Sequence, residues 1–291
     1  MYPARLRYEA PRSLEEASSL LADGGGEAKI LAGGQSLVPM LKLRFASPEM
    51  LVDINELPGL GYHERDADGT IRVGALCRHA DLERSTLLAR HQPTMMAVAP
   101  LVADPVVRNR GTLVGSLCHA DPQGDWASVM MALNASVVVH SNRGKRTIAM
   151  RDLVSGPFQN TLAIDEVAVE AVVPAPQGVA EGGYIKLERR VGDFATVGVA
   201  VAVDRVGGNV VAAGIGLTGV GGSTIAADEA AAILTGGPLS AEAIGEAAEL
   251  AAAAAHPHSD HRGSAEYKRH LVRVFTRRLL TGLMTSGEEA A

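Results

Sequence analysis

Two short stretches rich in small residues carry the clearest chemical signal in the sequence. The first, AGGQS at residues 32–36, follows the apolar pair Ile30 and Leu31 and precedes a helix-like segment that begins at Leu37. Glycines at a junction between a strand and a helix leave backbone N–H groups uncovered, and such groups bind anions, most often phosphate. An ordinary Gly-Gly turn explains the same letters, so the function of this stretch stays open at this point.

The second stretch, VRNRGTLVGSLCHADPQGDW, spans residues 107–126 and combines small residues with titratable side chains. Its small residues again expose backbone amides, and three polar residues follow them: His119, Asp121 and Asp125. Two such loops, about 80 positions apart, can converge on one extended ligand. A diphosphate suits them, because a chain of net charge -6 must hold an anion through local N–H dipoles rather than through its overall charge.

Two other motifs have simpler explanations, and a third motif, the nucleophile elbow, is absent. The glycines at 214, 216 and 219 spell G-x-G-x-x-G, but no helix opens within the motif and no second strand with an acidic end follows. We expect glycines near the end of a strand instead. The segment HPHSDHRGS at 256–264 has no regular ligand spacing, and it predicts a polar loop that leads to a helix cap at Ser264 rather than a metal site. The sequence has no G-x-S-x-G elbow, so nucleophilic hydrolysis is disfavoured.

Composition narrows the class of protein. The chain has 291 residues and no extended basic segment, which argues against a nucleic-acid partner. Cys77 and Cys118 are its only cysteines, too few for an iron–sulfur cluster or a Cys-rich zinc site, and they fit a reducing cytoplasm. The N-terminus lacks the apolar segment of a signal peptide, and the run 241–255 is too short and too charged to span a bilayer. We therefore expect a cytoplasmic protein without a transmembrane segment.

The pattern of elements predicts an α+β protein of three units. Residues 1–57 alternate helix and strand signals as a β-α-β unit, with Ser13 and Glu16 forming a capping box at the first helix. Residues 58–175 combine strands, helices and a hairpin around SNRGKR, and a Gly-rich linker at 175–183 joins them to residues 176–291. Three apolar strands and three helices follow, which predicts a three-stranded antiparallel sheet covered by helices.

At this point four segments together resemble one family: AGGQSL at 32–37, RNRGTLVGSLCHADPQGD at 108–125, YIKLERRVGDFATVGVAV at 184–201 and RGSAEYKRHLVRVFTRRLL at 262–280. They are similar to the FAD-binding medium subunit of the carbon monoxide dehydrogenase and xanthine dehydrogenase family of molybdenum hydroxylases. The resemblance covers essentially the whole chain in order. It implies a vanillyl-alcohol-oxidase-like FAD domain of two subdomains, followed by a C-terminal domain with a three-stranded sheet and helices.

The resemblance also implies which residues bind FAD. The family's two Gly-rich loops hold the diphosphate, Asp125 matches a carboxylate that hydrogen-bonds the cofactor, Leu162 an apolar residue of the flavin pocket, and Lys186 a lysine near the isoalloxazine. A cation there stabilises the negative charge of the reduced ring. The implied cofactor-binding residues are Ile30, Leu31, Ala32, Gly33, Gly34, Gln35, Ser36, Leu37, Ala103, Thr112, Val114, Gly115, Ser116, His119, Asp121, Asp125, Leu162 and Lys186. No catalytic residue and no metal ligand is expected in this chain.

One residue departs from the family pattern. The second loop normally reads T-x-G-G, and Val114 stands where the first of these glycines is expected. A valine resists a positive φ and keeps a phosphate at a distance, so a shifted loop or weaker FAD binding would follow if either feature is needed.

The function implied by the resemblance is that of the flavoprotein subunit of a three-component oxidoreductase. A large subunit would hold the molybdenum cofactor and the substrate, and a small subunit two [2Fe–2S] clusters, in a dimer of heterotrimers. Electrons would pass through FAD to an external acceptor. Two alternatives stay open from the sequence: a free-standing FAD-dependent oxidoreductase with its own substrate, and a nucleotide-binding module that has lost its flavin.

Overall fold

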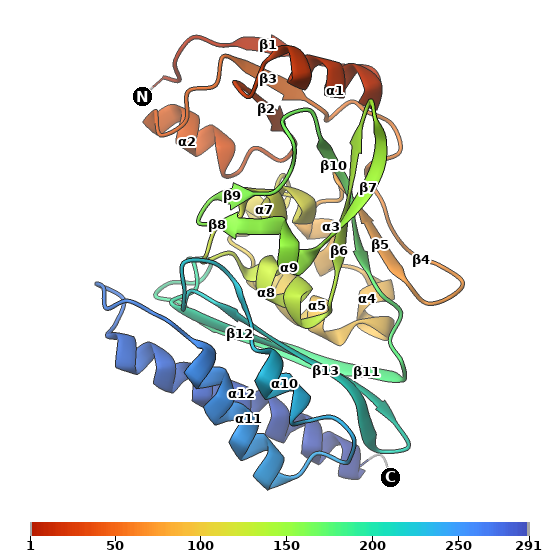
Figure 1. Ribbon diagram of the computed structural model, residues 1–291, viewed down its shortest axis with the longest axis vertical. Helices are drawn as coiled ribbons and strands as arrows, with labels where there is room; N and C mark the ends of the chain where they lie inside the picture. The colour runs from red at the N-terminus through yellow and green to blue at the C-terminus, as the bar shows by residue number, and fades with distance from the viewer. Residues whose placement is uncertain (1, 290–291) are drawn as a thin grey trace.

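The computed structural model describes residues 2–289, with side chains described through Thr285; residues 1, 290 and 291 of the predicted units lie outside this range. Three larger sheets follow one another along the chain, each accompanied by helices, and a fourth sheet has only two short strands. Figure 1 shows the larger sheets as three tiers, coloured from red at the N-terminal tier to blue at the C-terminal helices. The mixture of helices and sheets is as predicted, while domain boundaries after residues 57 and 175 stay a prediction.

The N-terminal tier is a parallel sheet of three strands in the order β1–β3–β2. Its elements are β1 (Arg7–Glu9), α1 (Leu14–Asp23), β2 (Ala28–Leu31), α2 (Leu37–Leu43) and β3 (Met50–Asp53). The pairing of β2 with β3 confirms the predicted β-α-β unit. Half of the predicted capping box forms: the Ser13 hydroxyl accepts from the N–H of Glu16 at 3.1 Å, but the Glu16 carboxylate accepts from the backbone N–H of Arg12 instead of that of Ser13.

The middle tier is an antiparallel sheet of five strands, in the order β4–β5–β10–β6–β7, with helices between β5 and β6. The hairpin predicted around SNRGKR is formed by β6 and β7. The strands are β4 (His63–Arg65), β5 (Ile71–Gly74), β6 (Ser136–Ser141), β7 (Gly144–Ala149) and β10 (Val167–Val173), with a small separate pair β8 (Val154–Gly156) and β9 (Gln159–Asn160). The helices are α3 (His79–Glu83), α4 (Thr86–His91), α5 (Pro93–Val98), the 3-10 turn η1 (Ala99–Leu101), α6 (Pro105–Arg108), α7 (Leu113–His119), α8 (Asp125–Ala132) and α9 (Met150–Leu153).

The C-terminal tier is an antiparallel sheet with helices on one face (Figure 1). Its elements are β11 (Val179–Leu187), β12 (Val197–Val206), β13 (Asn209–Thr218), β14 (Ile225–Ala226), α10 (Asp228–Ala232), α11 (Ala241–Ala254) and α12 (Ala265–Glu289). The predicted count of three strands was short by one, because two residues of β14 are too few to give a pattern. The predicted linker was also too long, since β11 begins at Val179.

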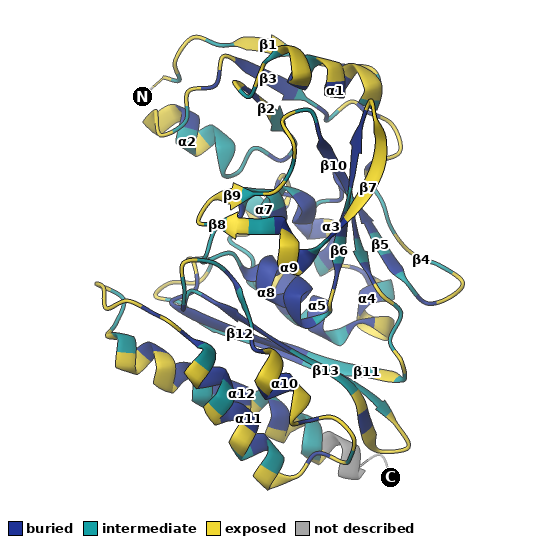
Figure 2. Ribbon diagram, viewed as in Figure 1, coloured by how far each residue is buried: buried dark blue, intermediate teal, exposed yellow. Residues whose placement is uncertain are grey.

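Strand β12 lies between two hydrophobic cores, because its side chains point alternately into one core and the other. Val197, Val199 and Val201 face the C-terminal helices, whereas Ala200 and Ala202 face the middle tier. This alternation follows from the two-residue period of a strand. Figure 2 accordingly shows β12 buried along most of its length.

The G-x-G-x-x-G letters form no Rossmann turn, as predicted, but two of the three glycines lie inside a strand rather than at its end. Gly214 and Gly216 lie inside β13, where a Cβ atom would come within 1.9 Å of the Ala132 and Ser128 carbonyl oxygens of α8. They therefore allow a helix to lie directly on a strand, and they form no Rossmann turn.

The histidine-containing loop at 256–264 ends as predicted. Ser264 caps α12, accepting from the N–H of Tyr267 at 3.1 Å. The Lys268 ammonium group holds the loop by donating to the Asp260 carboxylate at 2.7 Å and to the His258 carbonyl oxygen at 3.0 Å. Within residues 2–289 no group of three or more His, Cys, Asp or Glu side chains is placed to hold a metal ion, and no helix there has the length and apolarity needed to cross a membrane.

Candidate functional site

One large cavity brings most of the predicted residues together. Its volume is about 920 Å³, which is near the upper end of small-molecule and cofactor sites. The predicted residues that line it are Ile30, Ala32, Gly33, Gly34, Gln35, Ser36, Leu37, Ala103, Thr112, Val114, Gly115, Ser116, His119, Asp125 and Leu162. Leu31, Asp121 and Lys186 do not line it.

The two Gly-rich loops touch each other at Gly33. A Cβ atom on Gly33 would lie 2.4 Å from the Arg110 carbonyl oxygen and 2.7 Å from Gly111 Cα. Both neighbours are backbone atoms, which cannot rotate away. Only glycine therefore permits this approach, and the approach explains why segments so far apart in sequence share one cavity.

A chain of side-chain hydrogen bonds holds the same two loops together. The Asn55 amide donates to the Ala32 carbonyl oxygen at 2.8 Å. Arg78 donates to the Asn55 amide oxygen and, through its other terminal nitrogen, to the Arg110 carbonyl oxygen, both at 2.7 Å. Asn55 and Arg78 were not predicted as site residues, because neither lies in a Gly-rich stretch and their roles arise from contacts distant in sequence.

The first loop presents unused hydrogen-bond donors to the cavity. The backbone N–H groups of Gly33, Gly34, Gln35 and Ser36 donate to no acceptor within residues 2–289. Ser36 occupies the N-cap position of α2, yet its hydroxyl makes no capping hydrogen bond. Gly34 has a φ of +72°, a left-handed conformation that favours glycine. Donors of this kind are rarely left without partners in proteins, so the loop fits an anionic group such as a diphosphate.

The second loop is the start of helix α7. Thr112 is its N-cap, and its hydroxyl accepts from the N–H of Gly115 at 3.1 Å. A Cβ on Gly115 would lie 2.7 Å from this hydroxyl, which explains the glycine. Val114 lies within the helix, is not among the residues with positive φ, and is 98 % buried in the core. The backbone conflict considered for Val114 is therefore not present in this structure.

A buried network of charged and polar side chains contacts the cavity through Asp125. Asp125, the first residue of α8, accepts from the Tyr184 hydroxyl at 2.7 Å and from the Lys186 ammonium group at 3.1 Å. Lys186 also donates to the Leu101 and Asp193 carbonyl oxygens at 2.7 and 3.1 Å. Burial raises the pKa of Asp125, and the positive charge of Lys186 opposes this shift. Lys186 therefore does not line the cavity itself but contacts Asp125, which does.

Asp121 and His119 differ in their relation to the cavity, since only His119 lines it. Asp121 accepts from the N–H of Gln123 at 2.8 Å and stabilises the turn before α8. His119 lines the cavity, with its ring centroid 5.2 Å from that of Phe158, and burial lowers its pKa.

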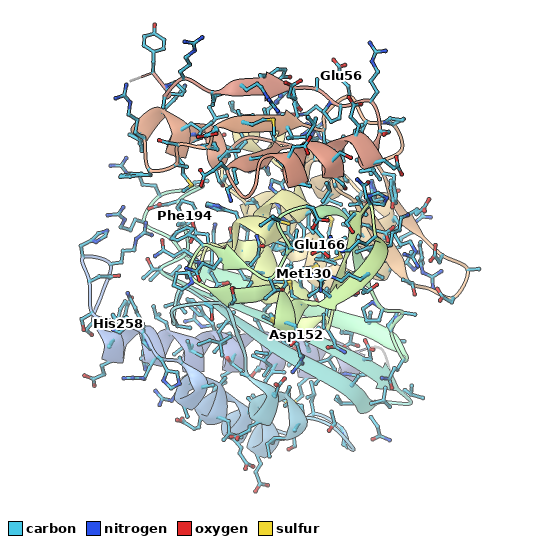
Figure 3. All side chains as sticks on the ribbon, turned by 45° about the horizontal axis from the view of Figure 1, so that its top comes forward. Glu56, Met130, Asp152, Glu166, Phe194 and His258 are labelled. Atoms are coloured by element: carbon cyan, nitrogen blue, oxygen red, sulfur yellow. The ribbon has the colours of Figure 1, made fainter. Side chains whose placement is uncertain are left out.

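Several lining residues were missed by the sequence analysis, among them Phe158 and the segment 192–194. Phe194 lines the cavity although its side chain is half exposed, and Figure 3 shows it at the edge of the molecule between the N-terminal tier and the C-terminal helices. Gly192 has a φ of +84°, and a Cβ there would lie 2.8 Å from the Ala103 carbonyl oxygen. Ala103 itself has a φ of +47°, so this contact holds strained backbone at the cavity.

Comparison with known proteins matches both parts of the chain. Residues 4–176 match the FAD-binding domain in molybdopterin dehydrogenase, and residues 183–283 match the CO dehydrogenase flavoprotein C-terminal domain. The nicotine 6-hydroxylase medium subunit of Paenarthrobacter nicotinovorans is 38% identical over 276 residues, which is 94% of this chain and 96% of that protein.

Solved structures agree with these matches. A carbon monoxide dehydrogenase from Hydrogenophaga pseudoflava, which lacks the Mo-pyranopterin moiety of its cofactor, contains a chain with a TM-score of 0.92 and 40% identity; the alignment covers 97% of this chain and 98% of that one. Quinoline 2-oxidoreductase from Pseudomonas putida 86 gives a TM-score of 0.89 at 33% identity, with 99% of each chain covered.

The FAD-binding domain and the cavity it encloses define the class of protein, an oxidoreductase flavoprotein. Within this class, the chain belongs to the family of FAD-binding medium subunits of carbon monoxide dehydrogenase and xanthine dehydrogenase type molybdenum hydroxylases.

Proposed function

We propose that this chain binds FAD in the cavity described above and passes electrons from an iron–sulfur partner subunit to an external acceptor. The observation that carries the proposal is the convergence of both Gly-rich loops and Asp125 on one cavity of about 920 Å³. When bound, FAD supplies the ability to accept and release electrons. The protein's own residues bind and orient it.

Each part of the cavity has a distinct role in this proposal. The four unused N–H groups from Gly33 to Ser36 bind the diphosphate, and Leu162 provides an apolar wall. Asp125 orients the cofactor, because Tyr184 and Lys186 fix both of its carboxylate oxygens. The positive charge of Lys186 lies one side chain away from the cavity and favours a negatively charged reduced ring.

The cysteine content supports a division of labour among subunits. A [2Fe–2S] cluster takes four cysteine ligands, whereas Cys77 and Cys118 are both free and are the only cysteines of the chain. In the proposed complex a small subunit carries two such clusters and a large subunit carries the molybdenum cofactor and the substrate. Two copies of this heterotrimer form the complete enzyme, which acts in the cytoplasm.

The proposal is tested by purifying the chain from its source at native expression levels. We expect two co-eluting partner subunits, a visible flavin spectrum, and flavin, iron and molybdenum in a ratio of roughly 1:4:1. Flavin on a solitary chain without metal would refute the complex and favour a free-standing FAD-dependent oxidoreductase. Absence of flavin from the intact chain would refute FAD binding itself.

A further inference from the structure

His79 is a buried titratable residue that the proposed function has not used. It is the first residue of α3, only 4% of it is exposed, and it lines the cavity. Nothing in the sequence marked it, because it follows Arg78 in a segment that reads as an ordinary helix start.

Trp126 determines which nitrogen of His79 carries the proton. The indole Nε1–H donates to His79 Nδ1 at 3.0 Å, and the two rings are inclined by only 18°, as expected for a hydrogen bond in the plane of both rings. An indole nitrogen can only donate, so Nδ1 must accept. The neutral imidazole then carries its proton on Nε2.

The surroundings keep this imidazole neutral. Burial, followed by the positive charges of Arg108 and Arg78, lowers the pKa of His79 to about 4. At neutral pH the side chain is therefore a donor at Nε2 and an acceptor at Nδ1. Its Nε2–H has no hydrogen-bond partner in the part of the chain that the structure describes.

The free edge of the ring lies at the junction of the two Gly-rich loops. A Cβ on Gly111 would be 2.8 Å from His79 Cδ2 and 3.0 Å from Nε2, and the His79 N–H donates to the Gly111 carbonyl oxygen at 3.0 Å. Gly111 is also the residue that Gly33 contacts. The backbone of both loops and the free Nε2–H thus lie together on the cavity wall.

We propose that the Nε2–H of His79 donates a hydrogen bond to the FAD diphosphate, with Trp126 holding the ring in the donating tautomer. This inference rests on the proposed function, since it needs FAD in this cavity. His79 is then a binding residue, and Trp126 is a positioning residue that acts through it. A neutral donor suits this place because two arginines already lie nearby and a third positive charge would be repelled.

The experiment compares His79→Phe and His79→Gln in the full chain, with FAD affinity measured by flavin fluorescence after removal of the cofactor. Phe fills the ring space without a donor, and Gln keeps an amide N–H near the Nε2 position. Loss of a hydrogen bond to a charged group predicts a Kd at least about tenfold higher for His79→Phe, with His79→Gln restoring most of the affinity. An equal Kd for His79→Phe and the wild type would overturn the inference.

A second measurement needs no variant that could fail to fold. Histidine ¹⁵N spectra of the wild-type chain should show His79 protonated at Nε2 alone, and adding ADP, which carries a diphosphate without a flavin, should shift that N–H resonance downfield. A proton on Nδ1, or an Nε2–H resonance unmoved at saturating ADP, would contradict the assignment. A wild-type chain that binds no FAD would refute the proposed function. A wild-type chain that binds FAD with an affinity unchanged by His79→Phe would refute only the role of His79.

Discussion

The substitution Gly33→Ala tests whether contact between the two Gly-rich loops builds the cofactor site. The added Cβ would lie 2.4 Å from the Arg110 carbonyl oxygen and 2.7 Å from Gly111 Cα. Ordinary contacts of a carbon atom are about 3.5 Å, so the loops must separate by roughly 1 Å. Such overpacking costs about 1–3 kcal/mol of unfolding free energy. It also moves the free N–H groups of the first loop, and loss of even one bond to a charged phosphate predicts at least about a tenfold weaker FAD affinity.

The assay is urea unfolding of the FAD-free chain together with FAD titration of the same preparation. Gly237→Ala is the matched control, because a Cβ there meets nothing within 4 Å and Gly237 has no positive φ. We expect the control to retain wild-type affinity. The reasoning is refuted if Gly33→Ala unfolds at the wild-type urea concentration and binds FAD as tightly as the control.

Three further predictions concern the packing and the buried titratable groups. Lys186→Met leaves Asp125 buried without its cation and should lower the free energy of unfolding in urea by about 3–5 kcal/mol. Adding Asp125→Asn should recover part of this loss. A double variant no more stable than Lys186→Met alone would argue against coupling between the two residues. Below pH 6.5 the unfolded state binds a proton at His79 that the folded state does not, so stability should fall by up to about 3 kcal/mol as the pH approaches 4, and His79→Gln should remove this component. Gly216→Ala would place a Cβ 1.9 Å from the Ser128 carbonyl oxygen and should lower the melting temperature sharply. Gly245→Ala, in an open position of α11, should instead raise the free energy of unfolding by up to about 1 kcal/mol. Equal effects of the two substitutions would contradict the contact between α8 and β13.

Elements with a strong local pattern could be predicted from the sequence. The unit of β2, α2 and β3 and the hairpin of β6 and β7 were predicted because apolar periodicity and turn residues define them locally. Strand β1, with the sequence RYE, was not predicted, since a short polar strand exists only through its pairing with β3. Strand β14 was missed because two residues are too few to give a pattern, and it is defined only by its pairing with β13.

The same distinction applies to the candidate site, where residues with a local pattern could be predicted and residues that act through distant contacts could not. Both Gly-rich loops could be recognised from the sequence, because glycine is favoured where the backbone takes a positive φ or approaches another segment closely. Asn55, Arg78 and His79 could not, because each acts on a segment far away in the sequence and the residue type alone gives no hint of the partner. The position of Lys186 also required the structure: the resemblance implied a lysine near the flavin, and the fold puts Asp125 between it and the cavity.

The start of helix α8 explains how the C-terminal tier takes part in a cavity to which it contributes few lining residues. Asp125 accepts from two side chains of β11, and the next residue, Trp126, donates to His79 of α3. The body of α8 lies directly on Gly214 and Gly216 of β13. A displacement of the C-terminal sheet must therefore move Asp125 and Trp126 together. Asp125 is itself a cavity-lining carboxylate, and Trp126 holds the cavity-lining imidazole of His79, so helix α8 connects both groups to the C-terminal sheet.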